Sequence, residues 1–145
     1  ILRTAGGPVL LVTRRNASRA RRLRLERAGA TVLEVASRDG RVDLRAALRA
    51  LGRRGIASVL IEGGGEVLGA ALDQKVGDRL VLYVAPRLLG GVAARPAFAG
   101  RGAAPVAGSA RLVMPRWRRI GSDWVVEARL RHGARERARR PGAGA

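Results

Sequence analysis

The sequence predicts an α/β fold: a mostly parallel sheet with helices on both faces, closed by a C-terminal antiparallel hairpin. Short apolar runs alternate with segments of helical periodicity, an order typical of parallel strands joined by right-handed crossovers. The run "DRLVLYVAP" (78–86) is almost continuously apolar, which is typical of a strand buried on both faces. Three glycines separate another apolar run from a helical segment, and ligands of α/β sheets gather at such strand ends.

The first two strands and the helix between them follow from apolar runs and caps. "PVLLVT" (8–13) and "TVLEV" (31–35) are short apolar runs and predict buried strands. Between them, Ser18 is a suitable N-cap for a helix, and Gly29 stands where a C-terminal glycine is favoured. This part of the sequence therefore predicts a strand, a helix and a second strand.

A polar turn at 36–41 leads to a second helix. Asp43 is its predicted N-cap, and the helix ends at Gly52 or Gly55. One apolar stripe along it predicts the face that packs on the sheet, and this stripe consists of Leu44, Leu48 and Leu51.

The remaining elements continue the alternation. "ASVLI" (57–61) predicts a third strand, "EVLGAALDQ" (66–74) a helix, and residues 78–86 the fourth strand. The loop at 87–108 is rich in Gly, Ala and Pro and is too long for a plain connector, so it is expected to border a site. Two apolar runs joined by Gly121-Ser122 predict the closing hairpin.

These elements form one domain over 1–131, followed by a tail. From His132 onward the chain shows no apolar periodicity, which predicts a disordered basic tail over 132–145. The chain begins with Ile1 and shows no signal-peptide pattern. We therefore expect the sequence to be N-terminally incomplete, a part of a longer protein. No apolar run approaches the length of a membrane span. The absence of cysteine is compatible with the cytoplasm, which is the expected location.

The composition excludes several classes of site. There is no cysteine and His132 is the only histidine, so disulfides, zinc sites of the His/Cys type and Ser-His-Asp nucleophile systems are not expected. No metal is predicted. The formal charge of +18 at first suggests nucleic acid. However, the arginines are spread over the whole chain without interleaved aromatics, which favours a solvated surface with local anion sites and no nucleic-acid partner.

The glycine run at Gly63, Gly64 and Gly65 predicts a phosphate site. Glycines between a strand and a helix expose backbone N–H groups at a helix N-terminus, where the helix dipole favours anions. The run is neither a Walker A loop nor G-x-G-x-x-G, because no Lys-Ser/Thr follows Gly69 and Leu68 occupies the place of the last glycine. A tight turn without ligand remains the alternative.

Glu62 directly precedes this glycine run, and its position has two possible explanations. An acidic residue near a helix N-terminus stabilises the helix by a few tenths to about 1 kcal/mol. A side chain at a strand end can equally contact a substrate, and the composition does not separate the two.

The stretch "GRRGIASVLIEGGGEVLGAALDQKVGDRLVLYVAPRLLGG" (52–91) resembles the reductase domain of the bifunctional riboflavin-biosynthesis deaminase–reductase. Family members carry a strand ending in "IEGG" or "VEGG", a helix of the "LAGALL" kind and a "LYIAP.LLGG" strand end. The resemblance covers about 7–130. It implies a dihydrofolate-reductase-like fold and NADPH-dependent reduction of the ribosyl group of 5-amino-6-(5-phosphoribosylamino)uracil to the ribityl form.

The resemblance also implies roles for individual residues. Glu62 matches the family's substrate-contacting glutamate, and Thr13 and Arg14 lie where this fold meets the adenosine end of the cofactor. Arg14 and Arg15 would suit a 2′-phosphate, although a solvated turn explains them equally. The segment matched to the NADP pyrophosphate, together with the first glycine, consists of Gly63, Gly64, Gly65, Glu66, Val67, Leu68, Gly69 and Ala70. No side chain is assigned as a catalytic group.

Three functional hypotheses stay open at this point. The first is an NADPH-dependent oxidoreductase of riboflavin biosynthesis, a homodimer whose parent chain carries an N-terminal zinc deaminase domain. The second is a non-catalytic, nucleotide-binding remnant of a dihydrofolate-reductase-like protein, because family segments that contact the nicotinamide and the substrate phosphate do not precede Ile1. The third, a basic nucleic-acid-binding module, rests on charge alone.

Overall fold

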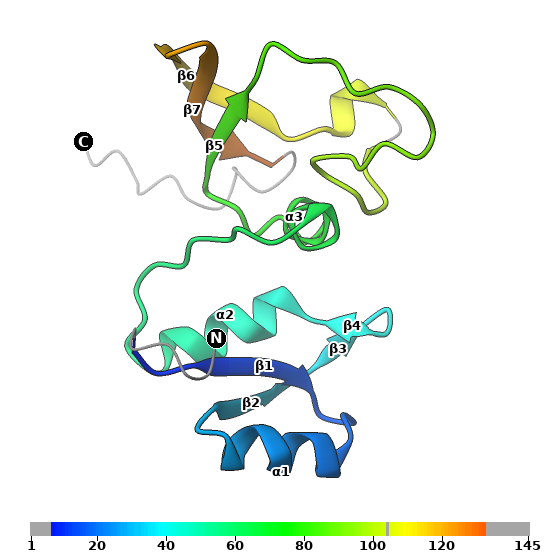
Figure 1. Ribbon diagram of the computed structural model, residues 1–145, viewed down its shortest axis with the longest axis vertical. Coiled ribbons are helices and arrows are strands. Elements are labelled where there is room, and N and C mark those ends of the chain that lie inside the picture. Colours follow the sequence, from blue (N-terminus) through cyan, green and yellow to red (C-terminus); the bar gives the residue numbers. More distant parts are fainter. Residues whose placement is uncertain (1–6, 104, 133–145) are drawn as a thin grey trace, which may run out of the picture. The chain divides into compact units, whose positions relative to one another are not determined.

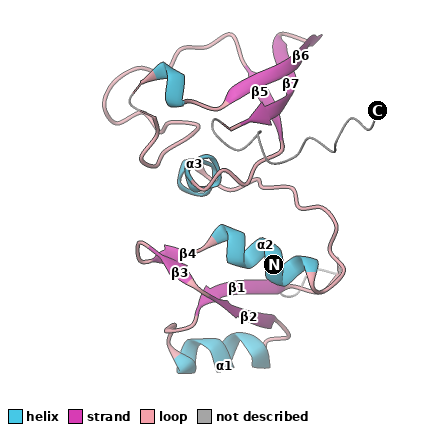
Figure 2. Cartoon of the chain, turned by 180° about the vertical axis from the view of Figure 1, so that it is seen from behind, coloured by secondary structure: helices cyan, strands magenta, loops and turns pink. Residues whose placement is uncertain are grey.

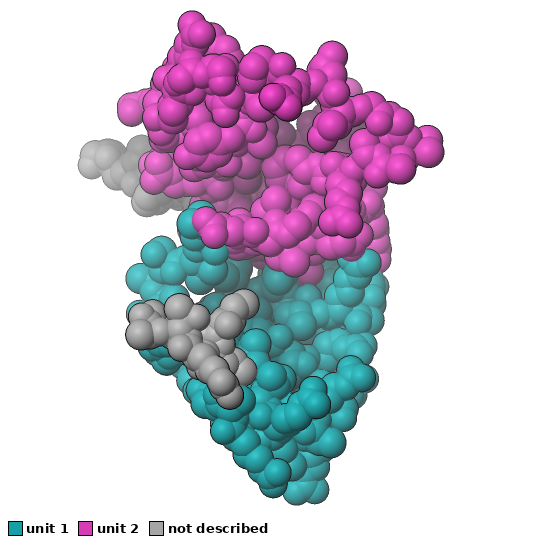
Figure 3. Space-filling view, viewed as in Figure 1, with its two compact units in different colours: residues 1–60 teal, residues 61–145 magenta. Residues whose placement is uncertain are grey.

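The computed structural model describes residues 7–103 and 105–132. The chain divides into two compact units, residues 1–60 and 61–145 (Figure 3), and each is described by itself. The tail predicted over 132–145 lies, from residue 133 onward, outside the described residues, so its disorder stays a prediction.

The first unit contains the predicted parallel strands with helices on both sides. Strand β1 (Leu10–Arg14) pairs in parallel with β2 (Thr31–Val35). Helices α1 (Arg19–Arg27) and α2 (Leu44–Gly52) lie on opposite sides of this strand pair (Figures 1 and 2). The β-α-β alternation that the sequence predicts is present here. The buried apolar side chains of this unit are those of Ala30, Leu33, Val35 and Ala47.

Both predicted N-caps of these helices are confirmed. The Asp43 carboxylate accepts a hydrogen bond from the backbone N–H of Ala46 at 3.0 Å. The Ser18 hydroxyl accepts a longer one, 3.5 Å, from the N–H of Arg21. Caps of this kind contribute about 1 kcal/mol each, because they satisfy N–H groups that have no acceptor within the helix.

The polar turn predicted at 36–41 is a small hairpin. Strands β3 (Ser37–Arg38) and β4 (Arg41–Val42) pair in antiparallel. The two residues between them, Asp39 and Gly40, have φ angles of 51° and 74°. Two consecutive positive φ values are typical of the type I′ turn, which Asp-Gly sequences favour.

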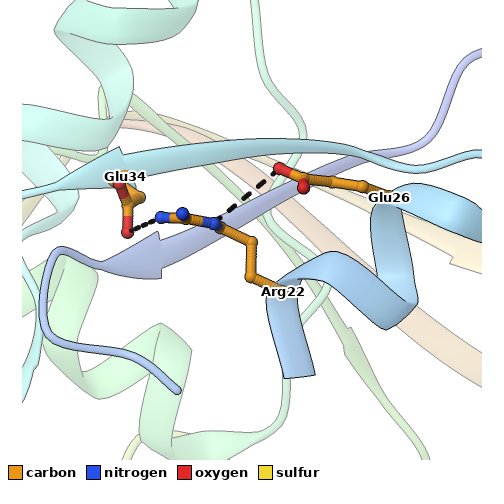
Figure 4. A network of polar contacts seen from close by, with 3 residues as sticks. All are labelled: Arg22, Glu26 and Glu34. Carbon is orange, nitrogen blue, oxygen red and sulfur yellow. Dashed lines mark ion pairs between the residues drawn. The ribbon is translucent and has the colours of Figure 1, made fainter. Parts of the chain in front are cut away.

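One ion-pair network joins α1 to β2. The Arg22 guanidinium lies 2.6 Å from a carboxylate oxygen of Glu34 and 3.9 Å from one of Glu26 (Figure 4). The side chains of Arg22 and Glu34 are about two-thirds buried, with 28% and 33% of their areas exposed. The network therefore fixes the helix on the strand pair in a place where the core itself is small.

The second unit begins with a helix and continues into an antiparallel sheet. Helix α3 (Gly65–Asp73) is followed by β5 (Arg79–Val84). A long loop with one 3₁₀ turn, η1 (Val106–Gly108), leads to β6 (Arg111–Ile120) and β7 (Asp123–Arg131). The strand order is β5-β7-β6 with both pairs antiparallel, so the predicted closing hairpin is confirmed. The buried side chains of this unit are those of Ala71, Val125, Val126 and Ala128.

The strand predicted at 57–61 is not formed. The described residues 56–64 have no strand assignment, and Val59 and Leu60 are 45% and 78% exposed. An isolated apolar run becomes a strand only where neighbouring backbone completes its hydrogen bonds, and the sequence pattern alone cannot supply that neighbour.

The prediction that residues 78–86 are buried on both faces is wrong. Strand β5 is an edge strand: only β7 pairs with it, and Val81 and Tyr83 are 48% and 63% exposed. Their face of the sheet continues onto Val125, which pairs with Tyr83 and is fully buried. Near-continuous apolar character therefore reflects here an antiparallel edge strand whose Val81 and Tyr83 are exposed, and not the interior of a parallel sheet.

No helix among the described residues has the length and apolar character needed to cross a membrane.

Candidate functional site

The N-terminus of α3 is the feature that the glycine run builds. Gly64 is the N-cap, with φ −63° and ψ 176°, and no side chain caps the helix. Its carbonyl accepts hydrogen bonds from the N–H groups of Val67 at 2.9 Å and Leu68 at 3.2 Å. The first N–H groups of a helix have no acceptor within it and carry the positive end of the dipole. This end of α3 therefore suits a negatively charged group.

The glycines of this turn have different physical reasons for lacking a side chain. A Cβ at Gly63 would lie 2.6 Å from the Cβ of Val67, and one at Gly65 would lie 2.5 Å from the carbonyl oxygen of Pro96. A Cβ at Gly69 would overlap the backbone carbonyl of Ala99. These three glycines are therefore explained by packing within the chain.

Gly64 is the exception. A Cβ at this position would meet nothing within 4 Å, and its φ and ψ are open to any L-residue. Nothing in the described chain therefore requires glycine at position 64. The open space over its backbone leaves room for an external group to approach the helix N-terminus, and this is what a pyrophosphate needs.

Residues 96–102 run along α3, and we call this segment the strap. The Ala99 N–H donates to the Gly65 carbonyl at 2.9 Å. At the other end of the helix, the Asp73 carboxylate accepts from the N–H of Arg101 at 2.8 Å and of Gly102 at 3.1 Å. The long loop that the sequence expects to border a site thus contacts the helix that carries the candidate site.

Glu62 lies two residues before the N-cap. It is exposed, and no hydrogen bond or ion pair of its carboxylate is found within the described part of the chain. The other residues predicted around the pyrophosphate follow in α3: Glu66 and Val67 are exposed, Leu68 and Ala70 are half-buried, and Gly69 is buried. The turn and the first two helical turns therefore form one continuous candidate site in the second unit.

Thr13 and Arg14 belong to the first unit, at the end of β1, and so to a separate candidate site. The Arg14 guanidinium donates to the Gly40 carbonyl at 2.8 Å. This bond gives Arg14 a structural role in holding the β3–β4 turn. Arg15 is exposed, and only its backbone N–H has a described bond, to the Val35 carbonyl at 3.3 Å. Of the two arginines, Arg15 is the one whose guanidinium remains available to an anion.

Asp73 was not singled out by the sequence patterns. Its position was visible as the third member of a series, Gly65, Gly69 and Asp73, spaced four residues apart along one helix face. The segment that packs against this face lies in a loop about 30 residues further along the chain. The spacing of residues within the helix does not reveal such a distant partner.

Over residues 7–103 and 105–132, the structure brings together no group of three or more His, Asp or Glu side chains that could hold a metal ion.

Comparison with known proteins connects this geometry to a family. The sequence profile of the family described as the RibD C-terminal domain matches residues 1–126. A riboflavin biosynthesis protein RibD from Actinobacillus pleuropneumoniae is 33% identical over 99 residues, which cover 68% of this chain and 26% of that protein. A 2,5-diamino-6-ribosylamino-4(3H)-pyrimidinone 5′-phosphate reductase from Methanothermobacter thermautotrophicus is 33% identical over 87 residues, covering 60% of this chain and 40% of that protein.

A solved structure gives the same result for the fold. Acinetobacter baumannii RibD superposes with a TM-score of 0.66 at 22% identity, over 84% of this chain and 37% of that one. The predicted α/β fold class is thereby confirmed. Among the described strands, however, only β1 and β2 pair in parallel, and the pairs β3–β4, β5–β7 and β7–β6 are antiparallel. The chain spans less than half the length of each of these three relatives.

Proposed function

The chain belongs to the RibD C-terminal domain family, and we propose that it carries the NADPH-dependent reduction of the ribosyl group of 5-amino-6-(5-phosphoribosylamino)uracil. The family is that of riboflavin-pathway reductases, and one relative is named as a pyrimidinone 5′-phosphate reductase. The cofactor's identity, the exact pyrimidine and the residue roles are part of the proposal.

One observation carries the proposal to particular atoms. The N-terminus of α3 is open at Gly64, where an added Cβ would meet nothing within 4 Å. At Gly63 and Gly65, by contrast, other atoms of the chain already occupy the space that a Cβ would need. We assign the cofactor pyrophosphate to this end of the helix, held by backbone N–H groups and the helix dipole. The contacting residues remain those predicted from the sequence, 63–70, with Gly64 at the point of closest approach.

When bound, NADPH would supply the hydride. What the chain itself must do is orient the two reactants, because hydride transfer needs little acid–base machinery beyond positioning. Glu62 is assigned to substrate orientation: its exposed carboxylate stands beside the proposed cofactor turn and can accept hydrogen bonds from hydroxyl groups of a ribose. We assign it no proton-transfer step.

The test is a pair of measurements on the same chain. NADPH binding is measured by fluorescence titration, and NADPH oxidation is followed with and without the pyrimidine substrate. Binding together with substrate-dependent oxidation supports the reductase. Binding without oxidation favours the alternative, a nucleotide-binding remnant. Absence of binding contradicts both.

The remaining partner assignments stay predictions. A homodimer is favoured by the edge strand β5, which only β7 pairs and on which Val81 and Tyr83 are 48% and 63% exposed. Sedimentation velocity checks it. A zinc deaminase domain in the parent chain follows only from the family resemblance, and a cytoplasmic location stays an expectation from the sequence. Thr13 and Arg14 stay the candidates for the adenosine end of the cofactor, and Arg14 and Arg15 those for a 2′-phosphate.

A further inference from the structure

The strap is fixed to α3 at both ends of the helix. At the C-terminal end, the two oxygens of Asp73 accept separate backbone hydrogen bonds, from Arg101 at 2.8 Å and Gly102 at 3.1 Å. At the N-terminal end, the Ala99 N–H donates to the Gly65 carbonyl at 2.9 Å. A nine-residue helix is thus spanned by one loop segment with an anchor at either end.

The helix face under the strap is shaped for it. Gly65, Gly69 and Asp73 are four residues apart and so share one face. A Cβ at either glycine would enter the backbone of residues 96–99. On the strap itself, Gly100 has φ +106°, and a Cβ there would lie 2.6 Å from Oδ2 of Asp73. Glycine is therefore needed on both partners at the places where they meet, and this contact is specific rather than incidental.

The N-terminal anchor acts on the proposed cofactor turn. Gly65 is the first residue of α3, directly after Gly64. Its carbonyl belongs to a rigid planar peptide group, so a hydrogen bond that holds the oxygen also fixes the direction of the next N–H. The strap therefore sets the orientation of the first helical turn, on the side from which an anion would be bound.

We propose that Asp73 is a positioning residue: it holds the strap on α3, and the strap in turn holds the first turn of the helix in the form that binds the cofactor pyrophosphate. This inference deepens the proposed function and rests on it. Asp73 stands eight residues beyond Gly65, at the far end of the helix, so its effect on the cofactor is exerted through the strap.

Such a coupling must be reciprocal. If an ordered strap favours cofactor binding, then the bound cofactor favours the ordered strap by the same factor, and couplings of this kind are typically 5- to 150-fold. Strap order can be read independently of activity from proteolysis, because Arg101–Gly102 is a tryptic bond held by both hydrogen bonds to Asp73. Ordered backbone is a poor protease substrate.

The experiment compares Asp73→Ala, which removes both acceptor oxygens, with Asp73→Asn, which keeps one. Asp78→Asn is the matched control, since it neutralises another exposed carboxylate of the same unit outside the strap. Two readouts are taken on the 145-residue chain. They are the NADPH dissociation constant and the rate of tryptic cleavage at Arg101–Gly102, resolved by mass spectrometry against cleavage at Arg87–Leu88.

We expect Asp73→Ala to weaken NADPH binding about tenfold, Asp73→Asn to fall between it and the unmodified chain, and Asp78→Asn to change nothing. Cleavage at Arg101–Gly102 should accelerate in Asp73→Ala, and NADPH should slow it in the unmodified chain. Should Asp73→Ala not fold, the intermediate loss in Asp73→Asn carries the same test.

Faster cleavage with an unchanged dissociation constant would overturn the inference, because the strap would then be packing alone. That result would leave the proposed function standing. An unmodified chain that does not bind NADPH would instead remove the proposed function and this inference together.

Discussion

Replacing Gly64 by valine tests the proposed cofactor site most directly. The backbone at this position, φ −63° and ψ 176°, is open to valine, and the added Cβ meets nothing within 4 Å in the chain. The substitution therefore adds volume only where an external group is proposed to lie. In this respect it differs from any substitution at Gly69, whose Cβ would overlap the backbone of Ala99.

The expected effect on stability is small. Removing a glycine reduces the entropy of the unfolded chain, which stabilises by about 0.4–1 kcal/mol at a compatible position. Valine is a poorer N-cap than glycine by a comparable amount. These two contributions oppose each other, so the melting temperature of Gly64→Val should stay within about 4 °C of the unmodified chain. Gly69→Ala, by contrast, forces backbone to move and should cost about 1–3 kcal/mol or more.

The expected effect on binding is large. Valine methyl groups would keep a pyrophosphate out of hydrogen-bonding distance of the helix N-terminus. Hydrogen bonds to charged groups are worth about 1.5–3 kcal/mol each. The loss of one raises the NADPH dissociation constant roughly 10- to 100-fold, and the loss of two or more removes measurable binding.

The assay is an NADPH fluorescence titration beside thermal unfolding of the same preparations. Weak binding by a fully stable Gly64→Val chain supports the site. Unchanged NADPH affinity in this variant would refute the reasoning, since the glycine run would then be a turn and nothing more. A parallel drop in stability and affinity would show instead that the open space at Gly64 was misjudged.

Three further predictions concern the remaining assignments. Glu62→Gln should change the NADPH affinity by no more than a few-fold, while kcat/KM for the pyrimidine falls by about 10- to 100-fold, as the loss of one charge-assisted hydrogen bond predicts. Equal losses in NADPH affinity and in kcat/KM would contradict a substrate role for Glu62. Arg15→Ala should reduce the ratio of the NADH to the NADPH dissociation constant, whereas Arg14→Ala should mainly lower the melting temperature, because it loses the hydrogen bond to the Gly40 carbonyl. Equal affinities for NADPH and NADH in the unmodified chain would contradict the 2′-phosphate assignment. Affinity for DNA should be weak and should fall steeply between about 50 and 200 mM salt. Sub-micromolar, sequence-selective binding at the higher salt would contradict the interpretation that the arginines form a solvated surface.

Local signals in the sequence were sufficient for most elements. The caps at Ser18 and Asp43, the helix after the glycine run and the hairpin at Gly121 are all present. Each depends on residues only a few positions apart, so the physical cause lies within the window that a pattern covers. The same holds for the type I′ turn at Asp39-Gly40, although the pattern indicated only a polar turn.

The failed strand at 57–61 and the wrongly predicted burial of the strand at 78–86 both depend on distant partners. An apolar run at 57–61 and another at 78–86 look alike in the sequence, yet one has no strand partner among the described residues and the other pairs with β7 about 45 residues later. Hydrophobicity measures what a segment could bury, whereas pairing is decided by which backbone lies beside it. That decision is not encoded within either run.

The glycine run illustrates the same limit within a single motif. Gly63, Gly64 and Gly65 are equivalent in the sequence, and all three were assigned to phosphate approach. In the structure, Gly63 makes room for the Val67 side chain and Gly65 for the carbonyl of Pro96, while Gly64 faces open space. A substitution at Gly63 or Gly65 would therefore weaken ligand binding through misfolding of the turn, and such a result would look like loss of a contact. Only position 64 separates the two causes, because there the chain tolerates a side chain and the proposed pyrophosphate does not.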